Sequence, residues 1–116
     1  MNKQRPMRGE IWLIDLDPIL GHEQGRQRPC VVISVNEFNL GNAELHIILP
    51  ITTKYRDLPT FVEINHDSGL KYKSFVICDQ IRTVSISRFE KRKLGKINNS
   101  VFQKIQNRLM FLLGFK

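Results

Sequence analysis

The sequence predicts a small, mainly β (α+β) protein, in which a strongly bent, SH3-like β-barrel is followed by one C-terminal helix. Two observations predict it. Short runs rich in β-branched and aromatic residues recur between clusters of turn-forming residues along most of the chain. An apolar stripe at helical spacing then occupies the C-terminal segment. With 116 residues, 41% of them hydrophobic, residues 1–116 are expected to form a single domain around one core.

Turn-forming residues divide the chain into short strands. Gly, Pro, Asn and Asp concentrate at 39–42, 57–59 and 65–69, which predicts turns there. The predicted strands cover residues 10–16, 30–35, 45–51, 60–64 and 74–84, with a short one near 93–97. The helix is expected to begin near Ser100, which has the capping-box spacing with Gln103. Its apolar stripe is formed by Val101, Phe102, Ile105, Leu109, Leu112 and Leu113.

The first predicted strand is apolar on both faces, with Trp12 and Ile14 on one and Ile11 and Leu13 on the other. A strand that is covered on both sides lies in a closed barrel or at an interface. Phe111 lies off the apolar stripe of the helix and adds further apolar surface. One small barrel with one helix is not expected to cover all of this surface, so a two-fold dimer is predicted to bury part of it.

The chain is basic, with 18 Lys and Arg against 11 Asp and Glu and a formal net charge of +7. The excess is concentrated between Arg82 and Lys96, where Glu90 is the only acid. Two interpretations remain open for this segment: a solvated basic face, or a surface that follows the phosphates of a nucleic acid.

Several classes of protein are disfavoured. No apolar run approaches the ~20 residues that span a bilayer, and the first residues do not resemble a secretory signal, so a soluble, cytoplasmic protein is expected. Cys30 and Cys78 have no zinc-site spacing and are expected to be buried thiols. The Gly21–Gly25 loop precedes a predicted strand and not a helix, which disfavours a nucleotide cradle. No metal or cofactor is expected.

Seven sequence blocks carry a family resemblance. They read RGEIWLIDLDP at 8–18, GHEQG at 21–25, RPCVVIS at 28–34, LPITT at 49–53, LPTFVEI at 58–64, CDQIRTV at 78–84 and LGKI at 94–97. In this order, over roughly residues 8–113, they resemble the MazF/PemK toxins, which are endoribonucleases of bacterial toxin–antitoxin pairs.

The resemblance implies an SH3-like barrel that forms a homodimer and cuts single-stranded RNA, chiefly mRNA, without a metal. It implies sequence-specific cleavage that leaves 2′,3′-cyclic phosphate and 5′-hydroxyl ends. It also implies a cognate antitoxin, whose acidic, disordered tail would cover the basic groove.

The residues of these blocks fit that chemistry. Attack of a 2′-hydroxyl on phosphorus builds negative charge on the phosphoryl oxygens and requires a proton acceptor. Arg28 is the expected catalytic cation, because a guanidinium can bind two such oxygens. Thr52 is expected to donate a hydrogen bond to the phosphate, and Glu23 to accept the proton. The alternatives are a surface arginine, a threonine that closes a turn and a solvated loop glutamate.

Further residues are expected to bind RNA. His22 stands where the family commonly has a small hydroxyl residue, and it could act as a base, stack on a nucleobase or have no role. Gln24 can read base edges, and Asp79 and Gln80 could instead bond a neighbouring loop. The full expected set is His22, Gln24, Arg26, Thr53, Lys54, Asp79, Gln80 and Arg82.

Two other functions remain open. A gyrase poison similar to CcdB shares the barrel but would not need both Arg28 and Thr52. A non-catalytic nucleic-acid-binding barrel would explain the charge but not the set Glu23, Arg28 and Thr52.

Overall fold

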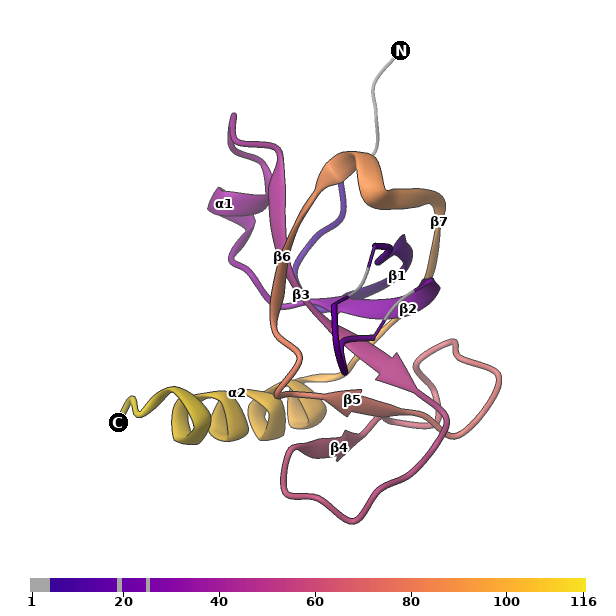
Figure 1. Cartoon of the computed structure of the whole chain (residues 1–116), viewed down its shortest axis with the longest axis vertical. Helices are drawn as coiled ribbons and strands as arrows, with labels where there is room; N and C mark the ends of the chain where they lie inside the picture. The colour runs from indigo at the N-terminus through magenta and orange to yellow at the C-terminus, as the bar shows by residue number, and fades with distance from the viewer. Residues whose placement is uncertain (1–4, 19, 25) are drawn as a thin grey trace.

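The computed structural model describes residues 5–18, 20–24 and 26–116. The elements follow one another as β1 (Glu10–Asp15), β2 (Gln27–Val32), α1 (Asn36–Asn39), β3 (Leu45–Thr52), β4 (Phe61–Glu63), β5 (Phe75–Ile77), β6 (Arg82–Ser85), β7 (Phe89–Lys96) and α2 (Asn99–Leu113) (Figure 1). A 3-10 turn, Ile86–Arg88, joins β6 to β7.

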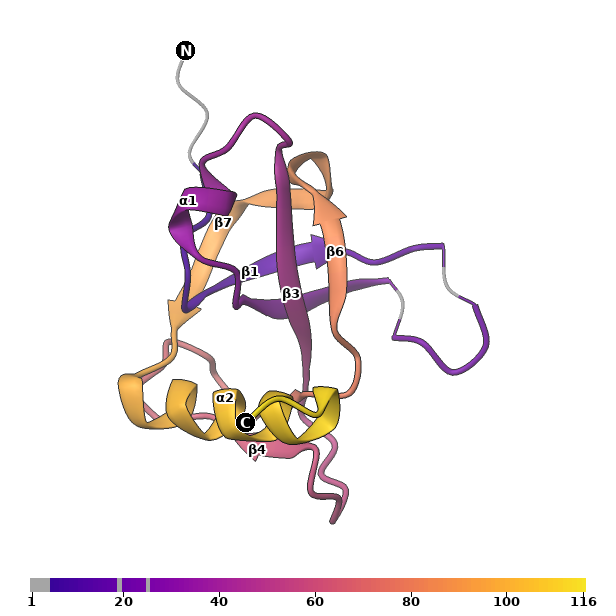
Figure 2. The ribbon, with the colours of Figure 1, turned by 90° about the vertical axis from the view of Figure 1, so that its left-hand side faces the viewer.

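The strands form one bent antiparallel sheet in the order β4-β5-β3-β2-β1-β7, and β6 pairs with β3 as well. In Figure 2, β1 and β2 cross the direction of β3 and β6, and α2 lies below the sheet near β4. The predicted class, mainly β with a C-terminal helix, is confirmed. Closure of a barrel is not detected, because no ladder among the described strands joins β6 to β7.

The strand predicted at 74–84 is wrong, because this segment forms two strands on the same edge of β3. Val76 in β5 lies opposite Ile51, and Arg82 in β6 lies opposite Ile48. The chain leaves β3 between them, and Cys78 N donates to Thr60 O at 2.9 Å. After β5 the backbone therefore stays beside the β4 segment for one more residue, Cys78, before it turns toward β6.

Pro50 occupies the position on β3 where the partner strand changes. Ile33 N donates to Ile47 O at 2.9 Å, so the polar backbone groups of Ile47 face β2. Since successive residues of an antiparallel strand alternate between the two edges, Pro50 directs its ring nitrogen to the opposite edge. Along that edge of β3, the pairing with β6 stops at Ile48 and the pairing with β5 starts at Ile51, so Pro50 faces neither strand. A proline is tolerated at this position because no ladder needs its missing N–H.

Other predicted boundaries shift for local reasons. β2 runs over 27–32 and not 30–35, because Asn39 of the unpredicted helix α1 donates to Ser34 O at 2.9 Å and draws the chain out of the sheet. β7 is longer than the predicted 93–97. The predicted cap of the C-terminal helix at Ser100 is wrong, since Asn98 Oδ1 accepts from Val101 N at 2.8 Å and serves as the N-cap.

The sheet separates two apolar clusters, and β1 contributes to both. Ile11 packs in the cluster that includes Val101 and Ile105 of α2. Trp12 and Ile14 face the other way, into a cluster that also contains residues of β2, β3 and β6. All three β1 side chains are buried within one chain. Trp12 and Ile14 therefore need no dimer to cover them, and that part of the argument for a dimer is wrong.

No helix in the described ranges has the length and the apolar character that crossing a membrane requires.

His46 on β3 is fully buried beside Phe89, with ring centroids 4.8 Å apart. Its Nε2 lies 2.9 Å from Pro6 O and must donate, because a carbonyl only accepts. Within the described structure, Nδ1 is buried without a hydrogen-bond partner. Burial lowers the pKa of His46 below its ordinary value, and the nearby Arg5 guanidinium also lowers it.

His46 should therefore make folding pH-dependent. The unfolded chain takes up the imidazole proton more readily, so the stabilisation is complete above about pH 6.5 and is lost as pH falls through the lowered pKa. We expect the free energy of unfolding in urea to fall from about pH 7.5 to about pH 5, and to fall less in His46→Gln. His66→Gln, at an exposed turn residue, is the control. An identical loss in wild type and His46→Gln would contradict this assignment.

Candidate functional site

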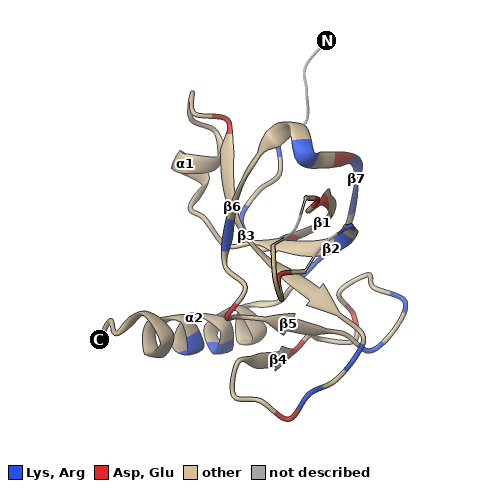
Figure 3. Cartoon of the chain, in the orientation of Figure 1, with Lys and Arg blue, Asp and Glu red and all other residues tan. Residues whose placement is uncertain are grey.

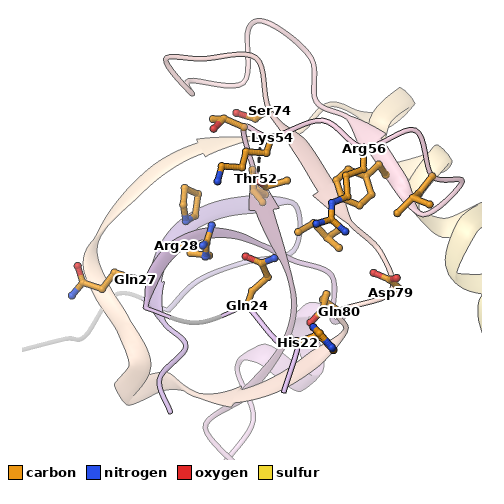
Figure 4. A pocket seen from close by; sticks show the side chains of 16 residues that line it. His22, Gln24, Gln27, Arg28, Thr52, Lys54, Arg56, Ser74, Asp79 and Gln80 are labelled. Atoms are coloured by element: carbon orange, nitrogen blue, oxygen red, sulfur yellow. Dashed lines mark hydrogen bonds between the residues drawn. The ribbon is translucent and has the colours of Figure 1, made fainter. Parts of the chain in front are cut away.

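A cavity of about 600 Å³ opens where β2 begins and β3 ends (Figure 4). Five parts of the chain contribute to it besides these two strands: the β1–β2 loop, the β3–β4 loop, the start of β4, β5 with the residue before it, and the β5–β6 turn. The residues that were predicted from the sequence and that line it are His22, Gln24, Arg28, Thr52, Thr53, Lys54, Asp79 and Gln80.

Arg28 and Thr52 enter this cavity from strands. Arg28 lies opposite Ile14 in the β1–β2 ladder and is half-buried. Thr52 is the last residue of β3 and lies opposite Phe75. Its Oγ1 accepts from Lys54 N at 3.1 Å, so the hydroxyl hydrogen points elsewhere and can be donated to a ligand. The two side chains are therefore carried by the sheet and not by a mobile loop.

Glu23 is not brought to this cavity. Its Oε1 accepts from Leu20 N at 2.7 Å, which closes a turn within its own loop. It lines a separate hollow of about 50 Å³, which borders the cavity because Gln24 and Gln80 line both. The expected set of Arg28, Thr52 and Glu23 is thus only partly assembled.

Arg82 holds the β1–β2 loop. Its Nη1 donates to Leu16 O at 2.7 Å. Arg88 assists, because its Nη1 donates to Asp15 O at 3.1 Å and also to Asp17 O. Two guanidinium groups thus bind three successive carbonyls where the loop leaves β1.

Arg26 belongs to the other end of the same loop. Its backbone N donates to Asp17 Oδ1 at 2.7 Å, and its carbonyl accepts from Leu16 N at 2.9 Å. The residue has a positive φ of 62°, and its exposed side chain does not line the cavity. Figure 2 shows that the described residues of this loop project away from the sheet.

Residues that were not predicted from the sequence complete the walls of the cavity. Arg56, from the β3–β4 loop, adds a third cation to Arg28 and Lys54, against the single carboxylate of Asp79. No spacing pattern marks Arg56, because it lies in an irregular loop. The other lining residues that were not predicted are Gln27, Pro29, Ile51, Leu58, Phe61, Ser74 and Ile77.

The cysteines do not offer a nucleophile. Cys30 and Cys78 are buried free thiols, and burial raises the pKa of each to about 12. A thiol with so high a pKa holds its proton and reacts poorly. Among the described residues, no three His, Cys, Asp or Glu side chains gather as a metal-binding group.

Comparison with known proteins identifies the family. The model of the PemK-like, MazF-like toxin of type II toxin-antitoxin systems matches residues 7–113. The chain belongs to this toxin family. Over 108 residues it is 30% identical to endoribonuclease PemK of Escherichia coli, covering 91% of this chain and 80% of the relative. It is thus a homologue of an endoribonuclease, and the resemblance seen in the sequence is confirmed.

Solved structures agree with this assignment. MazF from Deinococcus radiodurans superposes with a TM-score of 0.87 at 26% identity, over 97% of this chain and 99% of that one. An endoribonuclease in complex with its cognate antitoxin, from a mycobacterial species, gives a TM-score of 0.77 at 25% identity, over 96% and 97% of the two chains. The fold of this toxin-family chain is therefore the MazF fold.

The role of the loop arginines can be tested directly. Arg88→Ala removes the donors to Asp15 O and Asp17 O, so the loop should open more often. We expect the amides of Leu16 and Arg26 to exchange hydrogen faster, with a loss of stability on the order of 1–3 kcal/mol. Arg92→Ala, at an exposed residue of β7, should change neither quantity. Unchanged exchange in the loop of Arg88→Ala would contradict this role.

Proposed function

We propose that the protein is the toxin of a toxin–antitoxin pair, a metal-independent, sequence-specific endoribonuclease that cleaves single-stranded mRNA in this cavity. The whole chain acts as one toxin domain in the cytoplasm. The observation that carries the proposal is that Arg28 and Thr52, from neighbouring strands, line a single cavity with further cations. Family membership of residues 7–113 supports it.

In this proposal Arg28 binds the phosphoryl oxygens of the scissile phosphate. The 2′-hydroxyl of the preceding ribose loses a proton and attacks the phosphorus, and the 5′-oxygen leaves and takes up a proton from water. Charge that builds on the phosphoryl oxygens is stabilised by the guanidinium and by the hydroxyl of Thr52. The products are a 2′,3′-cyclic phosphate and a 5′-hydroxyl end.

The proton acceptor comes from the β1–β2 loop. His22 already lines the cavity, whereas Glu23 would have to break its bond to Leu20 N and turn inward. We therefore favour His22 as the acceptor and keep Glu23 as the alternative.

The remaining polar residues bind RNA around the scissile bond. Gln24, Thr53 and Lys54, with Asp79 and Gln80 from the β5–β6 turn, contact bases, sugars and phosphates. Arg26 is exposed and reaches RNA beyond the cavity, while Arg82 acts by holding the loop.

A homodimer and an antitoxin complete the proposal. Near the C-terminus, Phe111 is 81% exposed and Phe115 67% exposed, which leaves apolar surface for a second copy. Lys and Arg line β7 and the loops after β3 and β4 (Figure 3), and an acidic antitoxin tail fits this charge. The solved mycobacterial relative is an endoribonuclease bound to its cognate antitoxin.

Incubation with a long RNA in EDTA tests the function. We expect cleavage by the wild type and a loss of about 10²–10³ in rate for Arg28→Ala, the usual cost of removing one aligned donor. Thr52→Ala should lose less, since a neutral hydrogen bond stabilises less charge. Binding without cleavage would favour the nucleic-acid-binding barrel, and DNA breaks that require gyrase would favour the CcdB-like poison.

The pH dependence of cleavage distinguishes the two acceptors. A base must be unprotonated to act, so we expect the rate to fall on the acidic side and His22→Ser to lose that acidic limb. Glu23→Gln, at the neighbouring residue, should retain it. If Glu23→Gln loses the acidic limb and His22→Ser retains it, Glu23 is the proton acceptor.

A further inference from the structure

A second hollow, of about 320 Å³, lies beside the proposed cleavage cavity. It is formed by residues 63–74, the segment that leads from β4 to β5. Ser74 lines both hollows, so they meet at this residue. We propose that this second hollow binds a nucleotide of the RNA that flanks the cleaved bond, a proposal that rests on the function given above.

The frame of the hollow is held by backbone contacts. Ile64 N donates to Ser74 O at 2.9 Å and closes the base of the loop, and Lys96 N of β7 donates to Ser68 O at 2.8 Å. The loop lies directly on β7, because a Cβ placed on Gly95 would come within 1.9 Å of Ser68 O. Asn65 Oδ1 accepts from Asn98 N at 3.1 Å, which ties the loop to the start of α2.

The rim carries groups that suit a nucleotide. Tyr72 is 67% exposed, although its carbonyl accepts from the buried Ser74 Oγ at 2.7 Å, so its backbone is fixed while its ring is presented to solvent. Lys71 Nζ lies 5.7 Å from the centre of this ring. An exposed aromatic face stacks any base, and a neighbouring ammonium group attracts its phosphate.

The net positive charge of the hollow also favours a phosphate. Lys71 and Lys73 stand against one carboxylate, Glu63, among the residues that line it. Lys73 Nζ is 3.8 Å from Glu63 Oε1, but both side chains are more than half exposed, so this pair is weak. Lys73 can exchange it for a phosphate. An acidic peptide would use the lysines but has no need of the tyrosine ring, which is why RNA is the occupant we assign.

The test compares a short RNA that contains only the cleavage site with the same RNA extended on its 5′ side or on its 3′ side. In Tyr72→Ala, KM should rise about tenfold for one of the two extended RNAs, the order expected from a lost base stack. The kcat for that RNA should stay unchanged, and so should KM and kcat for the short RNA. Tyr72→Phe keeps the ring and should behave as the wild type, and melting temperatures check that the variants fold.

Two results would overturn the proposal: equal KM values for wild type and Tyr72→Ala on every substrate, or an equal rise for short and extended RNA. Loss of binding to a polyglutamate peptide in Lys73→Ala, with binding of the extended RNAs intact in Lys73→Ala and in Tyr72→Ala, would assign the hollow to an acidic protein instead. If the wild type cleaves none of these RNAs, the proposed cleavage function is wrong, but RNA binding in the second hollow can still be tested. Fluorescence anisotropy with the labelled RNAs then provides that test, since Tyr72→Ala should weaken binding of an extended RNA and not of the short RNA.

Discussion

The change of partner along β3 is the constraint on which the rest of the structure depends. One edge of β3 pairs with β2 over Ile48 to Pro50, while the other edge pairs first with β6 and then with β5. Pro50 lies at the change and offers no N–H to either partner there. Because β5 and β6 are separate, the turn between them can place Asp79 and Gln80 at the cavity. An unbroken strand would carry the same residues along the ladder.

The site combines rigid and movable parts, and their division suggests how it works. Arg28 and Thr52 are carried by paired strands, so the groups that would stabilise the phosphate are in place before RNA binds. His22, Glu23 and Gln24 come from a projecting loop that Arg82 and Arg88 hold at its base. In this account the electrostatic groups are preorganised, and the loop supplies the proton acceptor and the base contacts.

The sequence predicted what local pattern controls. β1, β3 and β4 were predicted to within a residue or so, because alternation and turn residues define them. Arg28 and Thr52 were expected at strand ends, and they line the cavity at the start of β2 and the end of β3. The features that the sequence did not predict depend on tertiary contacts. The break before β6 depends on the bond from Cys78 N to Thr60 O, and the inward role of Arg82 depends on Leu16 O, far away in the chain. Arg56 was missed because nothing in an irregular loop signals which way its side chain points.

The central claim is that the cavity at Arg28 and Thr52 cleaves RNA by attack of the 2′-hydroxyl. The most direct measurement first maps the cleavage site in an RNA. It then uses the same RNA with the single ribose before that site replaced by 2′-deoxyribose. The account predicts that this RNA binds as tightly as the unmodified strand and is not cut at that site. Cleavage at the same bond with an undiminished rate would contradict it.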